Sequence, residues 1–257
     1  MRHISESEAG GDLLQVREFV AAAQQAETLP DLHALLEAVC ADLDIDHYLF
    51  ASHVDFGNPP PGAVALGNYP REWVARARQK GAWRSDPILA ACEKTSAGFL
   101  WSELARLIPM SGPQYAFVRE GQRFGLGDGF SVPNHVPGEL LGSCHFAVRP
   151  GVAIAERNVS MLQTVASFGF EAARQLSRDV DRPVVLNAPL TDRQRDCVLL
   201  SAKGKSDSTI AQLLGLRPRT VNEHMEGAKR RFCVATRQQL IVRALYASQI
   251  TFSEVLQ

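Results

Sequence analysis

The sequence has no paired cysteines and no long apolar run, and each absence excludes a class of protein. Its five cysteines are scattered over 257 residues without a CxxC pair, which argues against a zinc site and against a disulfide framework. No apolar stretch approaches the length of a membrane-spanning helix, and residues 1–12 are polar and acidic, unlike a signal peptide. We therefore expect a soluble cytoplasmic protein with no metal, no cofactor and no membrane partner.

The formal net charge of −1 hides a separation of charge along the chain. Residues 186–257 hold eleven Lys and Arg against six Asp and Glu, a net charge of +5, and the remainder carries −6. An acidic body joined to a basic tail indicates that the tail alone meets a polyanion.

Hydrophobic periodicity predicts two domains of different architecture. We expect helices over 13–27, 32–43, 70–80, 112–124 and 154–177, another starting at Asp86–Pro87, and strands over 48–54, 63–66, 99–101, 129–132 and 140–148. Because helices and strands do not alternate regularly, the first domain should be α+β, an α/β/α sandwich with an antiparallel sheet. The proline-bounded segment 179–189 is the expected linker, which separates a domain over 1–178 from one over 190–257.

The last seventy residues predict a four-helix domain that contains a helix-turn-helix. Gly204 is a natural helix end, and Ser206 is a good N-cap for the next helix, which Gly215 terminates. A three-residue link then leads to Pro218, which suits the first turn of a third helix. Two helices joined by so short a turn are typical of DNA-binding proteins.

The third helix has an apolar face and a polar face. Val221, Met225, Ala228 and Phe232 share the apolar side at helical spacing. The candidate DNA contacts are Arg217, Arg219, Thr220, Asn222, Glu223, Glu226, Lys229 and Arg230. By themselves, the basic residues 229–231 indicate only a solvated face, but the turn pattern and the charge separation favour DNA. The two glutamates, which repel phosphate, indicate either base reading or weakened DNA affinity.

This tail resembles the LuxR-type helix-turn-helix. The family begins Leu-Thr-x-Arg-Glu-x-Glu, where this chain has LTDRQRDCVLL, and it continues with Gly204, the Ile210–Ala211 pair, Thr220–Val221 and His224. The chain departs from the family at Gln194, at Asp196 and at Arg217, which replaces the usual serine cap of the recognition helix. The resemblance implies the fold and leaves the operator sequence open.

The N-terminal part lacks the pattern of a phosphorylated receiver and lacks a P-loop. It has instead an Asn-Tyr-Pro triplet at 68–70, with Trp73 four residues after Tyr69, Asp86 thirteen after Trp73, and Trp101 fifteen after Asp86. In this spacing the chain resembles the autoinducer-binding domain of LuxR-type quorum-sensing receptors, which bind acyl-homoserine lactones.

The resemblance implies a role for each of these side chains. Trp73 would donate to the lactone carbonyl, Tyr69 to the acyl carbonyl, Asp86 would accept the amide N–H, and Trp101 would wall the lactone ring. A ligand with two carbonyls and one amide needs two donors and one acceptor in an apolar cavity. Taken singly, Asp86 before a proline predicts a helix cap, and each aromatic residue predicts core packing.

Three further residues complete the expected ligand site. Ala77 stands where several relatives have tyrosine and Ala82 where some have an aromatic residue, so we expect a pocket enlarged towards the acyl chain. Ile88 is expected in the same wall. His145 stands where a small hydroxyl residue is common, and it either bonds the acyl group or is a satisfied strand histidine.

These features predict a quorum-sensing transcription regulator that binds an acyl-homoserine lactone and acts as a homodimer on palindromic DNA. The long helix 154–177 and the last helix, 237–249, are the expected dimer contacts, and the resemblance admits RNA polymerase as a partner. The alternative is a regulator of the same fold that needs no ligand, or that answers to a non-lactone molecule or a partner protein. We do not expect an enzyme, because Ser143 and Cys144 point to opposite strand faces and no third group orients them.

Overall fold

The computed structural model describes residues 6–79, 83, 85–137, 139–178 and 189–257. These residues form two compact units, one holding helices α1 to α7 with the sheet and the other holding α8 to α12. The expected linker, apart from Pro189, lies outside the described residues, as does Ala82. No helix among the described residues is long and apolar enough to cross a bilayer.

The first unit is built on one antiparallel sheet of five strands, in the order β2-β1-β5-β4-β3. The strands are β1 (His47–Ser52), β2 (Ala65–Gly67), β3 (Phe99–Leu100), β4 (Asp128–Asn134) and β5 (Gly142–Val148). The antiparallel sheet predicted from the sequence is confirmed.

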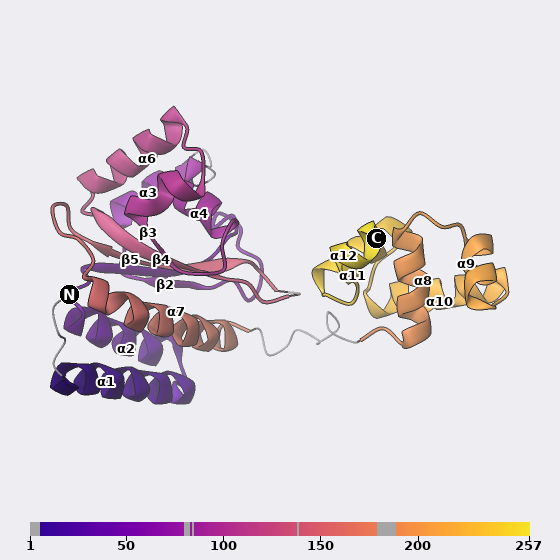
Figure 1. Cartoon of the computed structure of the whole chain (residues 1–257), viewed down its shortest axis with the longest axis horizontal. Coiled ribbons are helices and arrows are strands. Elements are labelled where there is room, and N and C mark those ends of the chain that lie inside the picture. The colour runs from indigo at the N-terminus through magenta and orange to yellow at the C-terminus, as the bar shows by residue number, and fades with distance from the viewer. Residues whose placement is uncertain (1–5, 80–82, 84, 138, 179–188) are drawn as a thin grey trace. The chain divides into compact units, whose positions relative to one another are not determined.

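Helices cover both faces of this sheet, so the expected α/β/α sandwich is also confirmed (Figure 1). One face carries α1 (Glu6–Gln25), α2 (Leu29–Asp42) and α7 (Glu156–Leu176). The other carries α3 (Arg71–Arg78), α4 (Pro87–Cys92) and α6 (Gly112–Arg123), with the short α5 (Leu104–Leu107). Every residue of β5 is buried as a result.

Alternation along the strands decides which side chains enter which layer. Tyr48 and Phe50 of β1 are fully buried in the core cluster that α2 and α7 contribute to. The residues between them point the opposite way, because successive strand side chains alternate. Leu49, which pairs with His145 across β1 and β5, therefore faces the layer of α3, α4 and α6.

Element ends differ from the sequence prediction where capping decides them. Helix α2 starts at Leu29 because the Thr28 hydroxyl accepts the Asp31 N–H while the Asp31 carboxylate accepts the Thr28 N–H. The strand expected over 99–101 ends at Leu100, and Trp101 opens the 3-10 turn η2 (Trp101–Glu103). Trp101 thus leaves the sheet edge and turns back over the sheet.

The described residues of the second unit, 189–257, form five helices where four were predicted. They are α8 (Asp192–Ala202), α9 (Asp207–Leu214), α10 (Pro218–Arg231), α11 (Arg237–Tyr246) and α12 (Phe252–Leu256). Helix α12 has five residues, too few for a periodic pattern. It forms because Thr251 caps it and because Glu254 binds Arg195 of α8.

The turn between α9 and α10 has the predicted construction. The Ser206 hydroxyl accepts the Thr209 N–H and caps α9, and Gly215 ends that helix with a left-handed φ of 66°. Val221, Met225 and Ala228 of α10 are buried against the other helices of the unit. The helix-turn-helix is therefore held rigidly by its own core.

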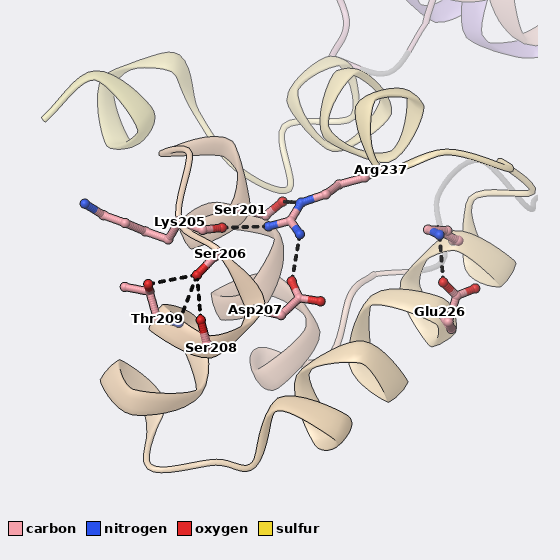
Figure 2. A network of polar contacts seen from close by, with 9 residues as sticks. Ser201, Lys205, Ser206, Asp207, Ser208, Thr209, Glu226 and Arg237 are labelled. Carbon is pink, nitrogen blue, oxygen red and sulfur yellow. Dashed lines mark hydrogen bonds and ion pairs between the residues drawn. The ribbon is translucent and has the colours of Figure 1, made fainter.

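Arg237, at the start of α11, ties three segments of this unit together. Its guanidinium donates to the Asp207 carboxylate at 2.7 Å, to the Lys205 carbonyl at 2.8 Å, and to the Ser201 hydroxyl. Figure 2 shows these contacts converging on the junction of α8 and α9. Charge-assisted bonds of this kind are stronger than neutral ones.

Replacement of Arg237 by Ala should loosen the α8–α9 junction, because one carboxylate and one carbonyl lose their donor. We expect a loss of about 1–3 kcal/mol of local stability, seen as faster amide hydrogen exchange in peptides from α8 and α9. Arg243→Ala, an exposed change on the same helix, is the matched control. Equal exchange in the two variants would contradict this role.

Candidate ligand cavity and nucleic-acid interface

A cavity of about 160 Å³ lies in the first unit, on the face of the sheet that carries α3, α4 and α6. All seven residues expected at the ligand site line it: Tyr69, Trp73, Ala77, Asp86, Ile88, Trp101 and His145. They come from α3 and the loop before it, from α4 and its N-cap, from the 3-10 turn η2 and from the strand β5. The fold thus brings together side chains that, in the sequence, were linked only by their joint spacing.

Asp86 caps α4 and also lines the cavity, so its interpretation as a helix cap and its interpretation as a cavity residue are compatible. Its Oδ1 accepts the Ile88 N–H at 2.8 Å at the start of α4, where Pro87 occupies the first turn. Burial nevertheless raises the pKa of this carboxyl to about 7, because the two backbone N–H bonds lower it by less. The carboxyl therefore titrates near neutral pH.

Tyr69 presents a buried hydroxyl without a partner. Its Oη has no hydrogen bond within the described residues, although its ring lies in the cavity wall. Burial raises the pKa of this phenol well above its usual value, and the neighbouring Asp86 raises it further. A buried hydrogen-bond donor without an acceptor costs about 1–3 kcal/mol. The hydroxyl therefore favours binding in the cavity of any molecule that has an acceptor oxygen.

Trp73 is held by aromatic neighbours rather than by polar bonds. Its ring contacts Phe117 at 4.8 Å and Phe124 at 5.7 Å between centroids. No hydrogen bond links its indole N–H to another described residue, and the side chain lines the cavity. A Cβ on Gly121 of α6 would lie 3.5 Å from the indole, an ordinary van der Waals contact, so this packing does not require glycine there.

Trp101 covers the sheet at a position that needs glycine. A Cβ on Gly129 would lie 2.4 Å from Cε2 of the indole, so any larger residue would displace the ring. The indole N–H donates to the Ser131 hydroxyl at 2.8 Å. Trp101 is therefore fixed in the wall with its donor already used.

His145 is a satisfied strand histidine in the cavity wall. Its Nδ1 lies 2.8 Å from the Ser131 hydroxyl and its Nε2 lies 2.7 Å from the Ser143 hydroxyl. The Ser143 hydroxyl also lies 2.7 Å from Nε2 of His53, another cavity residue. The alternative in which His145 bonds the acyl group directly is not favoured, because both ring nitrogens are engaged.

Sequence reasoning missed Ser131, Ser143 and His53 as polar partners at this site. The i, i+2 spacing of Ser143 and His145 places both on one strand face and could have indicated the first pair. That Ser131 lies beside His145 follows only from the pairing of β4 with β5. That His53 lies beside Ser143 follows only from the path of the chain after β1. Three more aromatic residues of the cavity wall, Phe56, Trp83 and Phe117, were also not predicted.

Neither of the two nucleophile types considered for the enzyme alternative, Ser143 and Cys144, lines the cavity. Cys144 lies in the opposite core and donates to the Ala166 carbonyl, as strand alternation predicts. Ser143 is fully buried, with 0% of its surface exposed, and lies behind the cavity wall rather than in it. Burial raises the pKa of the Cys144 thiol well above its usual value, so it remains a thiol.

The candidate DNA contacts lie on and before α10. Five are exposed, Arg217, Arg219, Asn222, Glu223 and Arg230, and three are partly buried, Thr220, Glu226 and Lys229. Arg217 occupies the N-cap position without a side-chain bond, as its replacement of the usual serine implies.

Two of these cations are paired within the helix. Nε of Arg219 lies 3.2 Å from Glu223, and Nζ of Lys229 lies 2.7 Å from Glu226. Both glutamates thus neutralise a neighbour one turn away. Among the candidate contacts, Arg217 and Arg230 are the cations without an ion pair to a described residue. Arg231 of α10 also has none and donates to the Pro189 carbonyl.

Comparison with known protein families identifies the class to which this protein belongs. The family described as "Autoinducer binding domain" matches residues 28–173, and "Bacterial regulatory proteins, luxR family" matches residues 188–244. A chain with these two parts is a quorum-sensing transcription regulator. It belongs to the LuxR family.

Named relatives cover most of the chain. It is 27% identical over 210 residues to the transcriptional activator AhyR of Aeromonas hydrophila, a match that covers 78% of each chain. It is 23% identical to the activator LuxR of Aliivibrio fischeri, over 86% of this chain and 88% of that one.

A solved structure of Escherichia coli SdiA has the same fold, with a TM-score of 0.66 at 21% identity. That match covers 91% of this chain and 97% of SdiA. The complex of SdiA with octanoyl-rac-glycerol gives a TM-score of 0.67 at 18% identity, over 96% and 97% of the two chains.

The raised pKa of Asp86 predicts a pH-dependent stability. In the absence of a ligand, the folded chain binds a proton on Asp86 between about pH 4 and pH 7 that the unfolded chain does not bind. The stability that this proton uptake provides is complete below the unfolded pKa and is lost as pH rises through 7. Asp86→Asn keeps a cap oxygen but cannot ionise, so its Tm should fall less on going from acid to pH 8.

The measurement is Tm of ligand-free wild type and Asp86→Asn across this pH range. At the alkaline end we expect Asp86→Asn to have a higher Tm than wild type, because wild type must bury an ionised carboxylate. The difference should be about 2–4 °C for each kcal/mol that this burial costs. Burial lowers the pKa values of His53 and His145, but both are present in each protein and cancel in the difference. Parallel profiles would show that Asp86 is ionised throughout.

Proposed function

We propose that this regulator binds an acyl-homoserine lactone in the cavity and, when occupied, binds palindromic DNA as a homodimer. The proposed ligand-binding domain is 1–178, the linker 179–189 and the DNA-binding domain 190–257. The observation that carries the ligand assignment is the unpaired Tyr69 hydroxyl in a cavity shared with Asp86 and Trp73. These three supply two donors and one acceptor.

The polar inventory of the cavity matches the head group of such a ligand. The Tyr69 hydroxyl and the Trp73 indole N–H are donors for the two carbonyl oxygens, and the Asp86 carboxyl accepts the amide N–H. Ala77 and Ile88 belong to the remaining wall, which is suited to an acyl chain. An occupant that satisfies these groups stabilises the folded first domain, because it binds the native state and not the unfolded chain.

Tyr69→Phe separates a ligand contact from a structural one. Removal of an unpaired buried hydroxyl should leave Tm of the ligand-free chain unchanged or raise it. Lactone affinity should fall about tenfold, the value of about one hydrogen bond. Titration calorimetry with a panel of acyl-homoserine lactones provides the measurement, and Tyr115→Phe, at an exposed tyrosine of α6, is the control.

The non-lactone alternative is tested in the same panel. SdiA has been solved with octanoyl-rac-glycerol, in which the acyl chain carries glycerol and no lactone or amide. This compound therefore joins the panel, together with mass spectrometry of whatever the chain retains from cells fed mixed lactones. Retention of the acylglycerol in preference to every lactone, or DNA binding unchanged without any ligand, would replace the proposal by the alternative.

For the DNA step we propose that α10 enters the major groove. Arg217 and Arg230 are cations without an ion pair to a described residue, and Asn222 and Glu223 are exposed groups that can contact base edges. The homodimer would use α11, on which Val242 is 65% exposed, and α7, on which Phe168 is 39% exposed. Each exposed side chain is an apolar group that a dimer contact would bury.

Glu223→Gln should strengthen non-specific DNA binding. It releases Arg219 from its ion pair and removes a charge that repels phosphate. The slope of log affinity against log salt should steepen by about 0.9, the value for one added phosphate contact. Fluorescence anisotropy on an unrelated duplex measures this slope, with Glu72→Gln, an equal charge change on exposed α3, as control. An unchanged slope with weaker binding would instead assign Glu223 to base contact.

A further inference from the structure

Two helices on the cavity face of the sheet, α3 and α6 (Figure 1), are joined by two successive pairs of side chains. The first pair is aromatic and buried: the rings of Trp73 and Phe117 lie 4.8 Å apart between centroids. The second pair is ionic: Nε and Nη2 of Arg76 donate to the two carboxylate oxygens of Glu120 at 2.7 and 3.2 Å. Residues three apart lie on one side of a helix, and each member of the ion pair comes three residues after a member of the aromatic pair. The ion pair therefore lies one helical turn along from the aromatic pair.

The position of α3 depends on contacts of this kind, because the helix is short and has no side-chain cap. It has eight residues, too few to be stable as an isolated helix, and its N-cap, Pro70, makes no side-chain hydrogen bond. Trp73 is its one buried residue. In its last turn, the Arg78 guanidinium lies 5.6 Å from the centroid of the Phe56 ring. Among the described residues, one buried indole and two arginine side chains thus orient α3.

The indole of Trp73 lies beside the backbone of α6. A Cβ built on Gly121, the residue after Glu120, would lie 3.5 Å from Cζ2 and 3.6 Å from Cη2 of the indole. In an indole ring, Cζ2 is two bonds from the nitrogen, on the edge that carries the N–H. The spacing of α3 and α6 at this level therefore decides where the indole N–H lies in the cavity.

The ion pair is better suited to fix this spacing than to stabilise the domain. The side chains of Arg76 and Glu120 are 44% and 31% exposed, and ion pairs that water reaches contribute little to stability. The pair is bidentate, however, and two parallel N–H···O bonds define the distance and the relative orientation of the two side chains. A ligand hydrogen bond weakens steeply when its donor is misaligned. A small displacement of α3 should therefore change ligand recognition more than stability.

We propose that the Arg76–Glu120 pair positions the indole N–H of Trp73, and so sets how strongly the receptor prefers a lactone to an acyl amide that lacks the lactone carbonyl. Neither Arg76 nor Glu120 lines the cavity, so both act through α3 and α6 rather than on the ligand. The inference rests on the proposed function, in which Trp73 donates to the lactone carbonyl, and it adds two positioning residues to that site.

Competition between two neutral ligands isolates the hydrogen bond that Trp73 donates. Cells that express the full chain are fed equimolar N-octanoyl homoserine lactone and N-cyclopentyloctanamide, which has the same acyl amide and ring size but no lactone oxygens. Mass spectrometry of the purified protein gives the ratio of the two retained compounds. We expect the ratio of lactone to amide in wild type to exceed that in Trp73→Phe about tenfold, as one hydrogen bond allows.

Three variants of the ion pair test the positioning. Glu120→Gln keeps the size of the side chain but loses its charge, so the ratio should fall about threefold, as expected for a weakened hydrogen bond. Arg76→Glu brings two carboxylates together and should lower the ratio at least as much. The double variant Arg76→Glu with Glu120→Arg restores an ion pair of reversed sign and should recover most of the wild-type ratio. Glu72→Gln, an equal charge change at an exposed residue of α3, is the matched control.

The outcomes separate this inference from the function on which it rests. Wild type that retains neither compound overturns both. Wild type with the ratio of Trp73→Phe, or Glu120→Gln with the ratio of wild type, overturns the positioning role and leaves binding of the acyl amide intact. A lower yield of Glu120→Gln at an unchanged ratio would mean that the pair only stabilises the fold, which also overturns it.

The double variant decides whether the pair or each side chain alone is responsible. A fall in the ratio that the charge reversal recovers, and that Glu72→Gln does not show, supports the positioning pair. A fall that the charge reversal leaves uncorrected assigns the effect to the separate side chains and overturns the proposal. The comparison of Glu120→Gln with wild type stands even if Trp73→Phe gives no soluble protein.

Discussion

The stability of the first unit is limited by two polar groups that it encloses in an apolar layer, Tyr69 and Asp86. Tyr69 has no bond for its hydroxyl, and Asp86 is held in surroundings that raise its pKa to about 7. Each of these conditions costs stability in the ligand-free fold. A molecule that supplies the missing acceptor and donor removes that cost, and this is the physical link between an occupied cavity and a stable domain.

The polar side chains on one side of the cavity have all their hydrogen bonds made, and those on the other side do not. Trp101 and His145 have every donor and acceptor engaged through Ser131 and Ser143, which fixes the sheet side of the cavity. Tyr69 and Trp73, on the helical side, have none of theirs engaged with described residues. This arrangement suits a receptor whose ligand fits against a rigid wall on the sheet side and forms hydrogen bonds with the free polar groups on the helical side.

In the second unit, five of the eleven cations are paired with a carboxylate among the described residues. Arg219 is paired with Glu223, Lys229 with Glu226, and Arg237 is used to join α8, α9 and α11. Because the net charge of +5 already subtracts these carboxylates, the pairing leaves it unchanged. It decides instead which cations remain without an ion pair to a described residue: Lys203, Lys205, Arg217, Arg230, Arg231 and Arg243.

Local patterns in the sequence were sufficient for the helix ends set by Asp86–Pro87, Ser206 and Gly215, for the antiparallel sheet, and for the seven residues that line the cavity. These depend on nearest neighbours, on periodicity and on a spacing that a family resemblance made meaningful. The hydrogen bonds that join Ser131, Ser143 and His53 to His145 or to each other, the helix α12 and the ion pairs of α10 were decided by tertiary structure. A hydrogen bond between strands depends on register, and register is set by which faces are buried across the whole sheet rather than by any local run of residues.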